Sequence, residues 1–224
     1  MLAWSEFVLA LGFFFASHSV PLRPSVRGPV TAWIGARSFG LGYSILSIAV
    51  LAWLIVAAGR APYVELWPRH EWQSWAPVIA MFAVCLILGF GLGRPNPLSF
   101  GGARNERFDP KRPGLIAWTR HPVLAALTLW TLAHMLPNGD LAHAILFGLF
   151  GIFSILGGHM IDRRKRRDMG DAAWRSLIAD IRQGDRLAGW GSVPEIAVRG
   201  ATTVGAYALL ILLHPIVLGV PPLP

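Results

Sequence analysis

The chain has 224 residues, of which 54% are hydrophobic and only 14% are charged, and its formal net charge is +8. A soluble domain typically carries about 25% charged residues, so this composition excludes an ordinary soluble protein and indicates a membrane protein. Basic loops beside anionic lipid explain the positive charge, and no folded soluble domain remains that would bind nucleic acid.

Six apolar segments approach the roughly 20 residues that a membrane-spanning helix needs, and proline or glycine marks the joins between them. The fourth and fifth segments are separated only by the turn at residues 137–140, so they should form an antiparallel hairpin. We predict an all-α, polytopic membrane helical bundle of about six spans, with residues 1–224 forming one integral membrane domain. In chain order, the segments are residues 2–19, 41–58, 76–92, 118–136, 141–161 and 200–218.

Lysine and arginine alternate between rich and poor joins along the chain. Residues 20–40 hold three, residues 93–120 hold six and residues 162–199 hold nine, whereas residues 59–75 hold two and residues 137–141 none. Because basic loops stay on the cytoplasmic side, this distribution predicts a multi-pass protein of the bacterial inner membrane with both termini in the periplasm.

The join after the fifth span contains a further helix. Residues 162–167 form a basic cluster at the membrane surface, and apolar residues then recur at helical spacing with charged residues between them. This pattern predicts an amphipathic helix on the cytoplasmic face that anchors the topology and contacts lipid headgroups, with substrate binding as the alternative role. Its apolar residues are Ala172, Ala173, Leu177, Ile178 and Ile181.

Several histidines lie in or beside the apolar segments, where an ionisable side chain needs a partner, a water-filled cavity or a ligand. A rise of about 1.5 Å per residue places His18, His121 and His159 near the cytoplasmic boundary, and His134 and His143 near the opposite face. The histidines therefore form two layers and cannot all serve one site.

Neutral imidazole is a common ligand of haem iron, and two facing helical histidines make a bis-histidine site. His18, His134 and His159 are the candidate cofactor-binding residues because all three lie within spans. Depth alone favours pairing His18 with His121 or His159. For each histidine the alternative is an ordinary role: His121 can start a helix before a proline, and His214 can hydrogen-bond at a kink.

Short motifs of histidine, arginine and aspartate extend from the first span to the end of the fifth. The chain resembles the NnrU family through these motifs, and that family is similar to the plant 15-cis-zeta-carotene isomerases. The resemblance covers most of the chain and is strongest in residues 119–164. The matching positions are His18-Ser19, Arg23, Arg37, Tyr43-Ser44, Thr119-Arg120-His121-Pro122, Trp130, Leu132-Ala133-His134 and Asp162-Arg163-Arg164.

The resemblance implies an integral membrane protein that binds haem b, with His18 and His134 as the iron ligands. His121 matches a histidine linked to activity, and with Arg120 it is the candidate catalytic group. In one family member a cysteine three residues before the second ligand takes part in a redox-dependent ligand exchange. This chain has Thr131 at that position, so the exchange is not available to it.

The function implied is redox-linked, either in nitric oxide metabolism and denitrification or as a haem-dependent cis–trans isomerase acting on an apolar polyene such as a carotenoid. One alternative is a non-catalytic accessory or assembly protein of a respiratory complex. Another is a small membrane methyltransferase that uses S-adenosylmethionine, since such enzymes resemble this chain at Arg120-His121-Pro122. Those enzymes usually carry paired glutamates after the hairpin, where this chain has Asp168 and Asp171.

Overall fold

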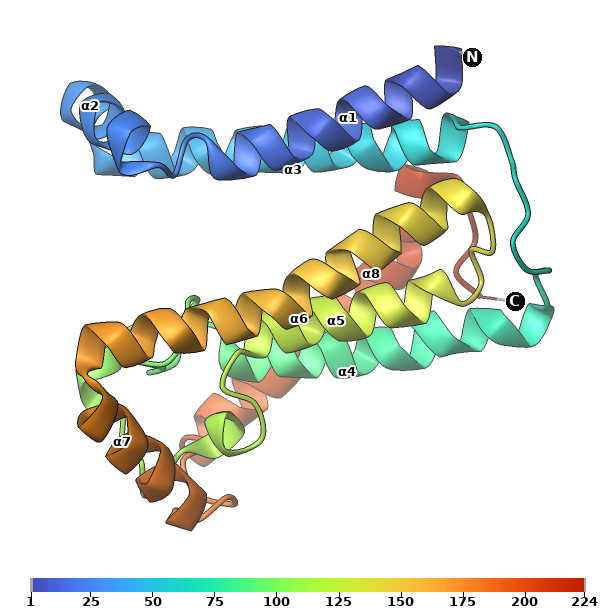
Figure 1. Ribbon diagram of the computed structural model, residues 1–224. Coiled ribbons are helices and arrows are strands. Elements are labelled where there is room, and N and C mark those ends of the chain that lie inside the picture. The colour runs from blue at the N-terminus through green and yellow to red at the C-terminus, as the bar shows by residue number, and fades with distance from the viewer. Residues whose placement is uncertain (1, 224) are drawn as a thin grey trace. The chain divides into compact units, whose positions relative to one another are not determined.

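A computed structural model of the protein describes residues 2–223, including the side chains of residues 4–223 (Figure 1). The chain divides into two compact units: unit 1 runs to Trp67 and includes Asp140–Leu146, and unit 2 comprises Pro68–Gly139 and the chain from Phe147 onward. The α-helices are α1 (Leu2–Ser19), α2 (Pro24–Ile34), α3 (Ala36–Arg60), α4 (Trp75–Gly91), α5 (Pro122–Met135), α6 (Leu141–Met169), α7 (Asp171–Gln183) and α8 (Val193–Leu218). Three short 3-10 helices are η1 (Glu71–Ser74), η2 (Asn105–Arg107) and η3 (Gly114–Ala117).

The predicted all-helical membrane architecture is confirmed. Within the described residues, four helices are long and apolar enough to cross a membrane, namely α3, α4 together with η1, α6 and α8. The pair α1 and α2, bent by 72°, forms a fifth candidate span. Helix α5 is apolar but has only 14 residues, or about 21 Å of length against a hydrocarbon core of about 30 Å. The expected number of six membrane-spanning helices therefore stays a prediction.

The start of α5 differs from the predicted segment 118–136, and Pro122 explains the difference. A proline disfavours helical backbone in the residue before it, and His121 has φ −120° and ψ 71°. The helix accordingly begins at Pro122, which tolerates the first helical turn because its missing N–H is not needed there. Pro24 begins α2 in the same way, within a join that the sequence analysis treated only as a basic loop.

In unit 1, α1 lies along α3 (Figure 1). Phe7 and Ala10 of α1 and Leu54 and Ala57 of α3 are all at most 1% exposed. These buried side chains hold the two helices together through close van der Waals packing.

In unit 2, α4 packs against both α5 and α8. Gly89 makes the approach of α8 possible, because a Cβ atom there would lie 2.1 Å from Oγ1 of Thr203. Farther along the same interface, the Tyr207 hydroxyl donates a hydrogen bond of 2.9 Å to the carbonyl oxygen of Val78. Small residues thus allow close packing where lipid supplies no hydrophobic driving force.

The predicted hairpin of α5 and α6 is confirmed by the register of its contacts. His121 faces Asp162, and Oγ1 of Thr128 lies 2.7 Å from Oγ of Ser154. As the residue number rises on α5, the partner's number falls on α6, so the two helices are antiparallel. The turn at residues 137–140 joins them.

The predicted amphipathic helix is confirmed as α7, and it turns away from the end of α6 (Figure 1). Its apolar face does not lie open to lipid. Trp174 and Ile181 form a buried cluster with Leu98 and Ile116 from the segment between α4 and α5. The chain's own loop therefore covers the side of α7 that the sequence analysis expected to face the membrane.

We expect Gly89→Ala to destabilise the protein by about 1–3 kcal/mol, because the added methyl group overlaps the buried Thr203 side chain. Thermal unfolding in detergent measures this effect. The matched control is Gly205→Ala on α8, where a Cβ atom has no neighbour within 4 Å. The double variant Gly89→Ala/Thr203→Ala should recover part of the loss, and equal midpoints for all three variants would contradict the packing argument.

Candidate functional site

Three of the histidines predicted to lie in spans share one side-chain arrangement. In each, ring Nδ1 lies near the carbonyl oxygen four residues earlier: 2.8 Å for His18, 2.9 Å for His134 and 3.0 Å for His159. A carbonyl oxygen can only accept, so Nδ1 carries the proton and the lone pair of the neutral ring is on Nε2. Metal-binding histidines commonly show this arrangement, because the Nδ1–H bond fixes both the tautomer and the ring orientation.

His18 lies in unit 1, near the end of α1. Its ring stacks on Phe14 with a centroid distance of 4.0 Å and meets the edge of Tyr43 on α3 at 6.1 Å. The hydroxyl of Ser17 lies 3.2 Å from Nδ1. Aromatic rings therefore flank the half-buried imidazole, and no acidic side chain of the described residues pairs with it.

His134 lies in unit 2, in the last turn of α5, and is also half-buried. Its ring centroid is 5.4 Å from that of Trp130 and 5.8 Å from that of Phe147. His18 and His134 thus belong to different units, and their pairing on one iron stays a prediction. His159, in contrast, lies on an exposed part of α6.

The structure brings the two candidate catalytic residues together through a shared carboxylate. Nη2 of Arg120 lies 2.6 Å from Oδ2 of Asp162, and Nε2 of His121 lies 3.0 Å from Oδ1 of the same side chain. The other ring nitrogen of His121, Nδ1, lies 3.0 Å from the hydroxyl of Ser99. We call Ser99, Arg120, His121 and Asp162 the polar cluster.

His121 is held in the neutral form within this cluster. Burial lowers its pKa below the usual 6.5, and the nearby Asp162 carboxylate opposes that effect only in part. A neutral ring has one donor and one acceptor nitrogen, so Nε2–H donates to Asp162 and Nδ1 accepts from the Ser99 hydroxyl. Both nitrogens of His121 are engaged with protein groups, unlike those of His18, His134 and His159.

Ser99 reaches the cluster because its loop is held by a buried asparagine. Asn96 is 1% exposed, and its Nδ2 donates a 3.0 Å hydrogen bond to the carbonyl oxygen of Arg120. Its Oδ1 accepts from the backbone N–H of Leu98 at 3.1 Å. This asparagine therefore ties the loop after α4 to the residues that precede α5, and places Ser99 beside His121.

Sequence reasoning did not find Ser99, and it did not assign Asp162 a role beyond the motif. The hairpin gives a signal for Asp162: the antiparallel register that joins Thr128 to Ser154 also brings the start of α5 to this part of α6. No local pattern points to Ser99, which joins the cluster from a loop outside that hairpin.

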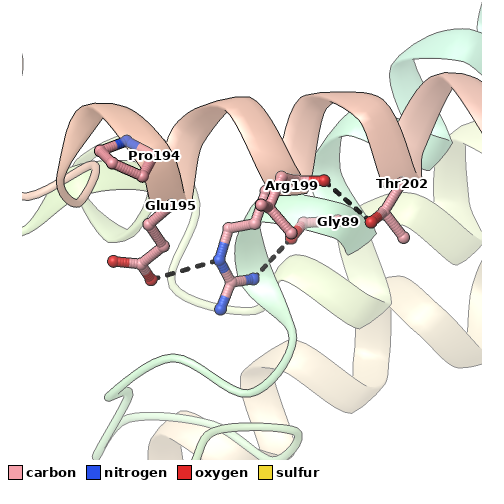
Figure 2. Close-up of a pocket in the computed structure, with 6 residues that line it drawn as sticks. Gly89, Pro194, Glu195, Arg199 and Thr202 are labelled. Atoms are coloured by element: carbon pink, nitrogen blue, oxygen red, sulfur yellow. Dashed lines mark hydrogen bonds and ion pairs between the residues drawn. The ribbon is translucent and has the colours of Figure 1, made fainter.

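Shallow hollows also occur elsewhere among the described residues of unit 2. The first, of about 530 Å³, lies between α4 and α8 (Figure 2). There Arg199 donates a 2.7 Å hydrogen bond to the carbonyl oxygen of Gly89 and lies 3.4 Å from Glu195. These bonds satisfy the carbonyl end of α4, which is a structural role. The second hollow, of about 490 Å³, lies at the junction of α6 and α7.

No group of three or more His, Cys, Asp or Glu side chains is placed to hold a metal ion within the described residues. A haem needs a different donor set, because its porphyrin supplies four nitrogens and the protein adds one or two axial ligands. The helical histidines with a fixed Nδ1–H have the chemistry of such ligands, so the residues present fit the group.

The comparison with protein families agrees with the motifs. Residues 6–222 match the family model described as NnrU protein, so the match covers nearly the whole chain. No curated protein and no solved structure matches the chain. The resemblance to the NnrU family is therefore confirmed.

We expect Asp162→Ala to lower stability by about 1–3 kcal/mol, because both Arg120 and His121 lose their acceptor in a partly buried setting. Asp168→Ala is the matched control on the same helix: its ion pair with Arg164 is 60% and 77% exposed, and removing it should change stability by less than about 0.5 kcal/mol. Thermal unfolding of both variants in detergent makes the comparison. A loss for Asp168→Ala as large as that for Asp162→Ala would contradict the assigned role.

The lowered pKa of His121 gives a second prediction, for acid stability. The folded pKa lies below the unfolded value of 6.5, so the unfolded chain binds the proton first as the pH falls. Stability should therefore be level above about pH 6.5 and decrease below it, until the folded pKa is passed. The groups that face this ring are Ser99, Arg120, His159 and Asp162.

His121→Gln tests this effect, because a glutamine amide keeps a donor near Asp162 but does not titrate. We expect the melting temperature of the wild type to fall more steeply than that of the variant between about pH 7 and about pH 5. Parallel curves over this range would show that His121 does not titrate with a lowered pKa. The difference between the two proteins removes the contribution of the other histidines.

Proposed function

The chain belongs to the NnrU family, and on this basis we propose that it is a haem-b-binding integral membrane protein with His18 and His134 as axial ligands. The observation that carries the proposal is the fixed Nδ1–H of both rings, which leaves the Nε2 lone pair for iron. Their aromatic neighbours support it, because an apolar setting suits a porphyrin. We place the protein in the bacterial inner membrane, with both termini in the periplasm.

When bound, the haem supplies one-electron redox chemistry to the site. The family resemblance leads us to propose a redox-linked role, either connected with nitric oxide and denitrification or as a cis–trans isomerase of an apolar polyene of the carotenoid type. Such a substrate has no ionisable group, and its entry from the bilayer would depend on apolar contact alone. Like the 15-cis-zeta-carotene isomerases, the protein would then act on a bond within the hydrocarbon chain.

Arg120 and His121 remain the candidate catalytic residues. We propose that they act when His121 takes up a proton, which offsets the charge of an added electron. His121 holds one proton on Nε2 against Asp162, and its Nδ1 can take a second proton while the Asp162 carboxylate compensates the new charge. Arg120 contacts the other oxygen of the same carboxylate, Oδ2. The polar cluster would thereby offset charge that electron uptake adds to the protein.

The decisive test is the absorption spectrum of the purified protein in detergent. The wild type should show a Soret band that shifts on reduction with dithionite, and His18→Ala and His134→Ala should each remove or alter it, because each loses an axial ligand. His70→Ala is the control, since His70 lies in the loop before η1 and its variant should keep the wild-type spectrum.

Four results would contradict the proposal or a part of it. A preparation that stays colourless after haem reconstitution excludes haem binding, and an unchanged spectrum in either ligand variant excludes that histidine. Binding of S-adenosylmethionine without haem would instead favour the methyltransferase. A haem-loaded protein that converts no polyene would support the non-catalytic accessory role.

A further inference from the structure

Helix α6 continues well beyond its apolar part. It has 29 residues, and the part from residue 141 to residue 161 is already about 30 Å long, which matches the hydrocarbon core of a bilayer. Residues 162–167 therefore lie within the next 10 Å or so of the axis. That is the depth at which the phosphate groups of a lipid leaflet are found.

The cationic side chains of this turn are not all neutralised by acidic partners. Arg164 forms an ion pair with Asp168 at 3.7 Å. Asp171 forms ion pairs with both Arg166 and Arg175. Arg163 and Arg167 have no ion pair with an acidic residue in the part of the chain that the structure describes. Their guanidinium groups, which fit phosphate through a planar fork of donors, are therefore available to an anion.

Three of these arginines line the hollow of about 490 Å³ at the junction of α6 and α7. It is lined by Arg163, Arg166, Arg167, Gly170 and Asp171. Gly170 takes a φ of +83°, a conformation that suits glycine, and this breaks the helix so that α7 starts at the rim of the hollow. No side chain caps that start, so the first backbone N–H groups of α7 add to the positive potential of the arginines.

The covered face of α7 gives an independent reason for a charge-based contact here. Trp174 and Ile181 are buried against Leu98 and Ile116, and Leu177 and Ile178 pack against the same cluster, so the chain itself covers most of the apolar stripe of α7. The cationic groups of this region are therefore its main means of attachment to the bilayer surface.

We propose that the hollow formed by Arg163, Arg166, Arg167 and the start of α7 binds the phosphate of an anionic phospholipid headgroup. Arg163 and Arg167 contact the phosphate oxygens. Asp171 holds Arg166 toward the hollow rather than repelling the ligand, because its charge is compensated by Arg166 and Arg175. The site is open on one side, as a ligand whose acyl chains remain in the bilayer requires.

The test measures lipid binding to the full-length protein by native mass spectrometry in detergent, with added phosphatidylglycerol and, in parallel, phosphatidylcholine. The wild type should retain phosphatidylglycerol in preference to phosphatidylcholine. In Arg163→Gln/Arg167→Gln the affinity for phosphatidylglycerol should fall by about tenfold to thirtyfold, which is the effect of two basic groups at a membrane surface. Circular dichroism checks that the variant remains folded.

The matched control is Arg107→Gln/Arg182→Gln, which removes the same charge from η2 and α7, outside the lining of the hollow. This control should bind phosphatidylglycerol as the wild type does, and an equal loss in both double variants would overturn the proposal in favour of diffuse attraction. A competition experiment with inorganic phosphate distinguishes a lipid headgroup from a free anion. Displacement of the lipid by equimolar phosphate would show that the hollow binds the free anion rather than a headgroup.

Discussion

The contacts between the segments of unit 2 depend on the carboxylate of Asp162. The two oxygens of Asp162 accept hydrogen bonds from Arg120 and His121, the last residues before α5, and so close the end of the hairpin opposite its turn. The loop after α4 joins the same point through Ser99 and through the bond from Asn96 to the Arg120 carbonyl oxygen. In an apolar bundle, where helix packing brings no hydrophobic gain against lipid, such polar contacts determine which helices stay together.

The hydrogen-bond partners of the ring nitrogens divide the histidines into two groups more clearly than their depth in the membrane does. His18, His134 and His159 each use Nδ1 for a carbonyl of their own helix, whereas His121 uses both nitrogens for groups from other segments. The first arrangement suits a metal ligand, and the second fixes a ring between two partners. Their common place in or beside apolar segments groups these residues together in the sequence, although the structure gives them different partners.

The sequence could predict the features that depend on local pattern. Apolar length indicated the spanning helices, the turn at residues 137–140 indicated the hairpin, and the spacing of Leu177, Ile178 and Ile181 indicated α7. What it could not supply were contacts between distant segments, such as Leu98 against Trp174 or Ser99 beside His121, because no periodicity connects them. The late start of α5 lies between these cases, since Pro122 restricts the residue before it by a purely local rule.

The shortness of α5 has a consequence for how the protein reaches its membrane. A helix of 14 residues falls below the length that a segment needs to partition into a bilayer by itself, whereas α6 exceeds it. Ser154 and Thr128 bond each other across the hairpin, and this contact forms only when both helices are present. As a span, helix α5 would therefore depend on α6 and enter the bilayer together with it as one hairpin.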